Sequence, residues 1–135
     1  MAVLADTGFL FALLDKDDPH HQESADFLKA EKEAIMVPFV VLPEVCYLAQ
    51  KYLGSHVEAA FLEGLLKGEM ALEWPSLADL RRGADILRSR PEFGVVDAMV
   101  MALAERLRIV RVATFDRRHF GSFQPSHGRP FELRP

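Results

Sequence analysis

Apolar residues along the chain form two patterns that alternate from one end to the other. Short, nearly continuous apolar runs are typical of strands buried on both faces. They occur at 1–5, 34–41, 71–74, 109–113 and, as a short edge strand, 131–133. Between them apolar residues recur at steps of three and four, the spacing of one helix face. The predicted helices begin after Gly8, at Pro19, at Pro43, near His56, at Leu77 and after Gly94.

This alternation of strands and helices predicts an α/β fold. We expect a three-layer α/β/α sandwich with a mostly parallel central sheet, because the strands are apolar enough to be covered on both faces. With half of its residues hydrophobic, the chain can form a core as a single domain, 1–135, without disulfides or a structural metal. Ligands of such sheets bind beyond the carboxyl ends of the strands. Functional residues are therefore expected at that edge.

The net charge of −4 conceals two parts of opposite sign. Residues 1–75 carry five Lys and 13 acidic residues, a net charge of −8, whereas residues 76–135 carry 11 Arg and seven acidic residues, a net charge of +4. Because the planar guanidinium of arginine suits phosphate, the second part is a candidate RNA-facing surface. The simpler interpretation is that arginines such as the four between 81 and 90 line the solvent face of one helix.

The chain carries no signal for secretion or membrane insertion. Its one cysteine, Cys46, cannot form an internal disulfide. No basic leader precedes the first apolar residues, and no apolar run approaches the roughly 18 residues that a membrane span requires. We therefore expect a cytoplasmic protein with no membrane partner.

Four acidic residues stand at the junctions between strands and helices. Asp6 and Asp116 come directly after apolar strands, and Glu44 and Asp97 fall in or near the first turn of a following helix. Each has an ordinary explanation when taken alone, since Asp caps helices and Glu in a first turn complements the helix dipole. However, the carboxyl ends of parallel strands and the amino ends of the next helices share one edge of the sheet. All four acids can therefore face the same crevice.

Four converging carboxylates would form a site for a hard divalent cation. Their mutual repulsion raises their proton affinity unless a cation enters, and oxygen ligands favour Mg²⁺, with Mn²⁺ as a substitute. Such an ion lowers the pKa of a bound water and stabilises charge on a phosphate, so the predicted reaction is phosphodiester hydrolysis. A phosphohydrolase of the HAD type is disfavoured, because it needs a second aspartate two positions after the first, where Gly8 stands.

The order and spacing of four short motifs resemble the PIN domain family, and within it the VapC-type toxins of bacterial and archaeal toxin–antitoxin pairs. The resemblance spans nearly the whole chain, and no single motif carries it alone. The motifs are Asp6-Thr7-Gly8-Phe9-Leu10, Pro43-Glu44-Val45, Val96-Asp97-Ala98 followed by Ala102-Leu103-Ala104, and Ala113-Thr114-Phe115-Asp116 with Phe120.

This resemblance implies an endoribonuclease that needs magnesium or manganese. Asp6 and Asp97 would be the most direct metal ligands, and Glu44 and Asp116 would complete the catalytic cluster. It also implies that the enzyme is the toxin of a pair and acts on RNA as a homodimer. A small antitoxin would neutralise it by placing a segment, often with an arginine, at the acidic cleft.

Several alternatives stay open at this point. A PIN-like fold could bind RNA or a protein without cleaving, its acids being kept for stability. His119 is expected to have a surface or packing role rather than to donate a proton to the leaving group. His20 and His21 are expected to be exposed at a helix start rather than to bind metal. The apolar residues at 39–52 and 57–66 are either an interface or part of the core.

Overall fold

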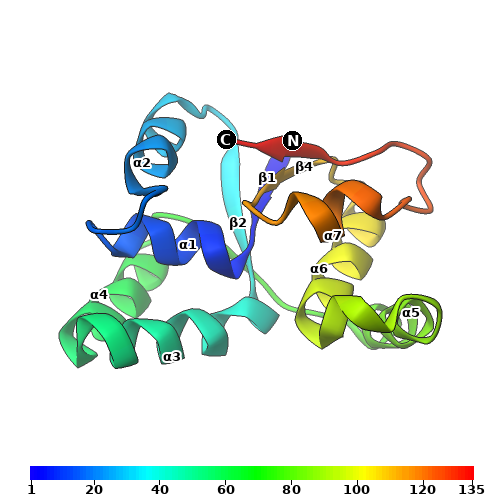
Figure 1. Ribbon diagram of the computed structural model, residues 1–135, viewed down its shortest axis with the longest axis horizontal. Coiled ribbons are helices and arrows are strands. Elements are labelled where there is room, and N and C mark those ends of the chain that lie inside the picture. Colours follow the sequence, from blue (N-terminus) through cyan, green and yellow to red (C-terminus); the bar gives the residue numbers. More distant parts are fainter.

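A sheet of five parallel strands forms the centre of the computed structural model, which describes residues 1–135. The strand order is β3-β2-β1-β4-β5, and every neighbouring pair is parallel (Figure 1). The prediction of a mostly parallel sheet is confirmed. The strands are β1 Ala2–Ala5, β2 Ala34–Pro38, β3 Ala71–Glu73, β4 Arg111–Ala113 and β5 Glu132–Arg134.

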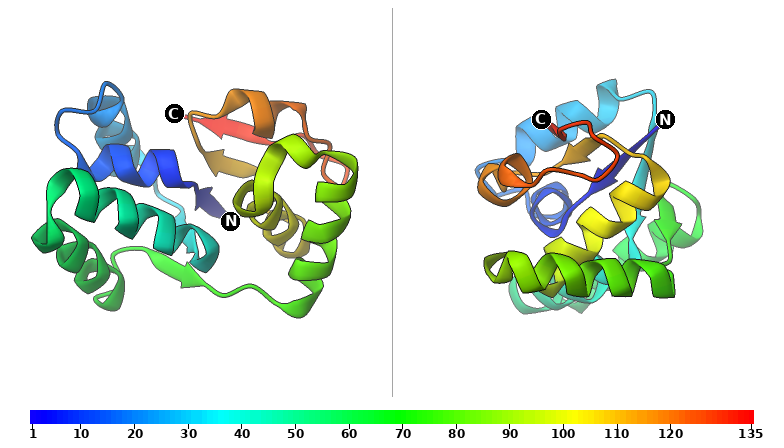
Figure 2. Two further views of the ribbon diagram at one scale, coloured as in Figure 1. Left: turned by 60° about the horizontal axis from the view of Figure 1, so that its bottom comes forward. Right: turned by 90° about the vertical axis from the view of Figure 1, so that its right-hand side faces the viewer.

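Helices cover the sheet on both sides. Figures 1 and 2 show α1 to α4 on one side of the strands and α5 to α7 on the other, which confirms the predicted α/β/α sandwich. No helix combines the length and the apolar character needed to cross a membrane. The helices are α1 Thr7–Leu14, α2 His21–Ala30, α3 Leu42–Leu53, α4 Ser55–Leu66, α5 Leu77–Ser89, α6 Gly94–Leu107 and α7 Arg117–Ser122.

The core is centred on β1 and α6. Val3, Leu4 and Ala5 are completely buried, because β1 has a strand on either side and helices over both faces. Every residue of α6 from Ala98 to Ala104 is buried, so this helix is apolar around most of its surface over two turns. The amino ends of α1 and α6 are thereby held in place relative to the sheet, which matters because both carry acidic residues.

Several predicted boundaries differ from those of the structure, and three strands show why. The apolar run 34–41 is a strand only as far as Pro38, and 39–41 forms a 3₁₀ turn that is continuous with α3. That turn is apolar because it is packed inside the protein, with Val41 fully buried, and not because it joins the sheet. The strand predicted at 109–113 begins at Arg111, since the backbone N–H of Ile109 still bonds Ala104 at the end of α6. The last strand lies at Glu132–Arg134, one residue later than predicted.

Candidate active site

Two of the predicted acids follow neighbouring strands. Ala5 and Ala113, the last residues of β1 and β4, pair in register, so the chain segments after them lie side by side at the carboxyl edge of the sheet. Asp6 continues this contact, because its backbone N–H donates to the carbonyl of Ala113 at 3.1 Å. Thr114 then joins the two segments: its hydroxyl donates to Oδ2 of Asp6 and accepts from the backbone N–H of Asp116 at 2.9 Å.

Asp6 is a buried carboxylate at the start of α1. Its side chain caps the helix, with Oδ1 accepting from the N–H of Phe9 at 3.0 Å, and the residue is only 7% exposed. Burial raises the pKa of Asp6 from 3.8 to about 6, although the hydrogen bonds from Thr114 and Phe9 oppose the shift. The negative charges of Asp97 and Asp116 raise this pKa further. Burial is thus the main reason that Asp6 holds its proton more tightly than a free aspartate, and the neighbouring carboxylates add to the effect.

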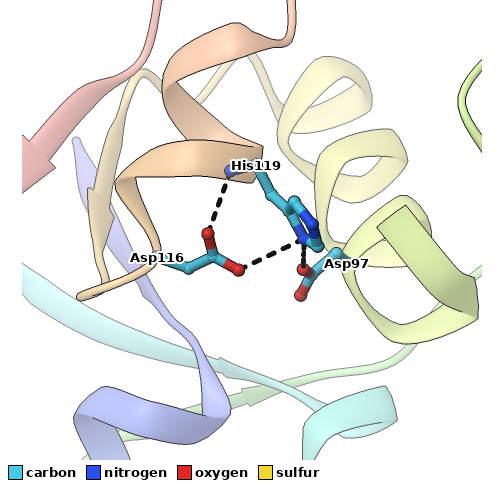
Figure 3. A group of neighbouring side chains, drawn as sticks. All are labelled: Asp97, Asp116 and His119. Carbon is cyan, nitrogen blue, oxygen red and sulfur yellow. Dashed lines mark hydrogen bonds and ion pairs between the residues drawn. The ribbon is translucent and has the colours of Figure 1, made fainter. Parts of the chain in front are cut away.

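Asp97, Asp116 and His119 form the tightest group at this edge (Figure 3). Asp97 lies in the first turn of α6, and Asp116 caps α7 by accepting from the backbone N–H of His119 at 2.9 Å. Nδ1 of His119 lies 2.7 Å from Oδ2 of Asp97 and 3.2 Å from Oδ2 of Asp116. Since both oxygens can only accept when ionised, the ring nitrogen is the donor in these contacts. One ligand atom from each residue lies within 4.8 Å of the others.

Burial also raises the pKa of Asp97. The hydrogen bond from His119 lowers this pKa, and the negative charges of Asp116 and Glu44 raise it again. The carboxylates thus act on one another electrostatically even where they do not touch. This coupling is the behaviour expected of acids that share one crevice.

Glu44 is placed at the same edge from the other side of the sheet. It lies in the first turn of α3, and its Oε1 accepts a 2.6 Å hydrogen bond from the hydroxyl of Thr7, the first residue of α1. Glu44 is exposed and does not belong to the tight group of Asp97, Asp116 and His119. The structure therefore brings the four predicted acids to one edge, with Glu44 at its margin.

His119 is the residue whose position the sequence interpretation misjudged. It was expected at the surface or in packing, but its imidazole bonds two of the four acids. The imidazole also packs against the ring of Phe93, with 5.1 Å between the two centroids. The guanidinium carbon of Arg90 lies 4.4 Å from the centroid of the Phe93 ring. A signal was present in the spacing: a residue three positions after a capping Asp can turn its side chain back toward the cap.

His20 and His21 have hydrogen-bond partners outside the group of Asp97, Asp116 and His119. Nδ1 of His21 contacts the carbonyl of Ala12 at 2.7 Å, and Nδ1 of His20 contacts Oε1 of Glu23 at 2.5 Å. His20 is exposed at the start of α2, as predicted, whereas His21 is half-buried. Neither side chain joins the carboxylates of the candidate site.

The donor set fits a hard divalent cation. Asp97 and Asp116 share a position with the imidazole of His119, and the negative charges of these two aspartates add to the rise in the pKa of the buried Asp6. A cation would remove that repulsion, and carboxylate oxygens are the ligands that Mg²⁺ and Mn²⁺ prefer. Asp97 and Asp116 are the side chains closest to a shared position, with Asp6 beside them.

The raised pKa of Asp6 predicts a specific dependence of stability on pH. Because the folded state binds this proton more tightly than the unfolded state, the free energy of unfolding should fall as pH rises from about 4 to about 6. Asp6→Asn keeps the cap but removes the charge. Without divalent metal at pH 7 we expect it to be more stable than the wild type by up to about 3 kcal/mol. Urea denaturation in EDTA should show this difference vanishing near pH 4, and a difference independent of pH would contradict the assignment.

Comparison with known proteins places this fold and site in a family. A model of the PIN domain matches residues 3–123. Over 135 residues the chain is 30% identical to Ribonuclease VapC26 of Mycobacterium tuberculosis, covering 98% of this chain and all of that one. The crystal structure of M. tuberculosis VapC20, described as a sarcin–ricin loop cleaving toxin, superposes with a TM-score of 0.84 at 20% identity, over 98% of this chain and 99% of that chain.

A further solved structure has the same fold. A chain of a toxin–antitoxin complex from Klebsiella pneumoniae gives a TM-score of 0.69 at 21% identity, covering 90% of this chain and 92% of that chain. The family match extends over most of the sequence and includes every acid described above. The protein therefore belongs to the PIN domain family.

Proposed function

We propose that this protein is a magnesium-dependent endoribonuclease that hydrolyses RNA phosphodiesters and acts as the toxin of a toxin–antitoxin pair. The observation that carries the proposal is the convergence of Asp6, Asp97 and Asp116 at the carboxyl edge of the sheet, with the pKa of Asp6 raised to about 6. A binding module has no need for buried, mutually repelling carboxylates. The relative named a ribonuclease and the neighbour described as an RNA-cleaving toxin support the same activity.

Some side chains of the site would bind the cation, and others orient these ligands. Asp97 and Asp116 would hold the cation together with Asp6, and Mn²⁺ would substitute for Mg²⁺. When bound, the cation supplies a water of lowered pKa and charge to stabilise the phosphate. Glu44, at the margin, would complete the acidic cluster, and its side chain is exposed to solvent.

The supporting residues fix the carboxylates in place. Thr114 orients Asp6 through its hydroxyl, and Thr7 does the same for Glu44. His119 donates to Asp97 and lies 3.2 Å from Oδ2 of Asp116, so its ring keeps these two carboxylates close together. Such contacts reduce the reorganisation needed when metal and phosphate enter, which is how residues around a metal site raise its activity.

Two protein partners belong to the proposal. A small antitoxin would neutralise the enzyme by placing a cationic side chain at the acidic cleft, consistent with the neighbour solved as a toxin–antitoxin complex. A second copy of the chain would cover apolar side chains of α3 and α4 that are left exposed. These are Tyr47, Tyr52, Leu62 and Leu66. They fall within the segments 39–52 and 57–66, for which the sequence left interface and core as alternatives.

The experiment that tests the activity is cleavage of structured RNAs by the purified protein. We expect internal cuts in Mg²⁺ and in Mn²⁺, no cuts in EDTA, and recovery when excess Mg²⁺ follows the chelator. Cleavage that persists in EDTA would contradict the metal requirement. RNA binding without cleavage in either metal would favour the alternative, a non-catalytic PIN-like module that binds RNA or protein.

A further inference from the structure

The arginines of the second part of the chain are mostly committed to ion pairs. Seven of the eleven have a carboxylate within 4.0 Å: Arg82, Arg88, Arg90, Arg106, Arg111, Arg129 and Arg134. Of the other four, Arg117 and Arg118 directly follow Asp116 in the first turn of α7 and are exposed. Arg117 donates only to the backbone oxygen of Pro135, at 3.1 Å. Two of the four arginines without a carboxylate partner thus adjoin Asp116, whereas Arg81 lies on α5 and Arg108 at the end of α6.

An aromatic pair stands on the other side of Asp116 along the chain. The ring of Phe115 stacks on the imidazole of His20, with centroids 4.0 Å apart and an interplanar angle of 15°. Phe115 is half-buried, whereas the His20 side chain is 49% exposed. Phe115 lies between Thr114 and Asp116 in the sequence, so the backbone that carries the stacked ring adjoins the site. The outer ring of the pair is His20.

We propose that His20 and Phe115 form a stacking platform for an unpaired nucleobase of the RNA substrate, next to a phosphate held by Arg117 and Arg118. This inference rests on the proposed endoribonuclease function and assigns the residues that would position the RNA strand beside the site. An exposed ring backed by a second ring offers a flat, rigid face, and bases stack on such faces with little regard to sequence. A base can reach the platform only if it is unstacked from its own helix.

The charges around His20 determine which part of the RNA it can receive. Oδ1 of Asp18 accepts from the backbone N–H of His20 at 2.8 Å, and Oε1 of Glu23 lies 2.5 Å from its Nδ1. These carboxylates repel phosphate but not the face of a neutral base. The phosphate is therefore assigned to the arginine side of Asp116 and the base to the histidine side, which gives the strand a direction across the site.

A cycle that combines changes in protein and RNA tests the platform. An RNA hairpin whose loop contains a cut mapped with the wild type is remade with an abasic residue on either side of that cut. At one position we expect the missing base to lower kcat/KM of the wild type by roughly tenfold to a hundredfold, the range that loss of one stack produces. His20→Ala should show a similar loss on intact RNA and little further loss on abasic RNA. His20→Tyr, which keeps a ring, should restore most of the rate.

Matched controls separate stacking from general damage. His56→Ala removes another exposed histidine, in the first turn of α4, and should leave the abasic effect at its wild-type size. Arg117→Gln with Arg118→Gln should flatten the salt dependence of KM, by up to about one unit of log–log slope per lost phosphate contact. Arg129→Gln, an exposed arginine just before β5 and so at the opposite edge of the sheet, should not.

The possible failures are distinguishable. An equal abasic effect in the wild type and in His20→Ala would overturn the platform and leave the nuclease intact. A His20→Ala variant that loses only antitoxin binding, with unchanged RNA kinetics, would assign the stack to the protein partner and overturn the proposal. A wild type that cleaves no RNA in Mg²⁺ or Mn²⁺ would overturn the proposed function, and this inference with it.

Discussion

Replacing Asp97 by asparagine should lower the rate of RNA cleavage on the order of a thousandfold, and Asp6→Asn should have an effect of similar size. A bound cation contributes several kcal/mol to stabilising a phosphoryl transition state, and each 1.36 kcal/mol is a factor of ten in rate. Asparagine keeps the shape of the side chain but removes the charge that would hold the cation. Single-turnover cleavage of a mapped RNA in saturating Mg²⁺ measures the loss. Expression of the wild type alone should arrest growth, and expression of Asp97→Asn should not.

The matched control is Asp85→Asn, the same change at an exposed position of α5, where the carboxylate pairs only with Arg88. It should cleave at the wild-type rate. Far-ultraviolet circular dichroism would establish that each variant is folded. Cleavage at the wild-type level by Asp97→Asn would refute the assignment of this residue. Asp6→Asn should be inactive and yet more stable in EDTA, the combination expected when a functional site is built at a cost in stability.

Of the substitutions proposed here, Asp79→Ala should lower the free energy of unfolding the most, by about 2–4 kcal/mol. The Asp79 carboxylate is 2% exposed and accepts from Nε of Arg106 at 2.9 Å and from the backbone N–H of Ser76 at 2.9 Å. Although burial raises its pKa, the hydrogen bonds from Arg106 and Ser76 hold that pKa below its usual value. The substitution removes the N3 half of the capping box of α5, in which Ser76 is the N-cap, and leaves Arg106 without its main partner. Because Arg106 is itself 35% exposed, the cost stays below that of a wholly buried pair.

Urea denaturation at pH 7 measures this change, and Asp85→Ala provides the comparison. Asp85 lies on the same helix, but its ion pair with Arg88 is exposed, so the expected loss is less than about 1 kcal/mol. Neither substitution touches the candidate active site. Equal losses for the two variants would show that the network between α5 and α6 does not stabilise the fold.

The parts of the structure that could be predicted from sequence are those governed by a local rule or by topology. Parallel strands bring their carboxyl ends to one edge, so the convergence of Asp6 and Asp116 followed from the apolar runs before them. The start of α3 also followed from a local signal, Pro43, which stands in the first turn of that helix. These inferences needed no knowledge of which side chains meet.

The parts that could not be predicted depend on contacts between distant residues. Helix α7 has six residues, too few to show a helical pattern of apolar positions. The imidazole of His119 on α7 reaches Asp97 only when α6 and α7 are packed together. The same holds for Arg111, whose partner Glu31 is 80 positions away. From the sequence, such arginines are candidates for phosphate binding. In the folded protein, most of them instead pair with carboxylates.

The acids of the site come from both helical layers and from nearly the whole length of the chain. Asp6 is made first, and the hydroxyl that orients it belongs to Thr114, 108 positions later. During synthesis on the ribosome, a nascent chain therefore cannot assemble the site until α7 has emerged. Fragments from interrupted translation would carry the early acids without their partners. For an endoribonuclease toxin of the kind proposed, completing the site last keeps every unfinished copy inert.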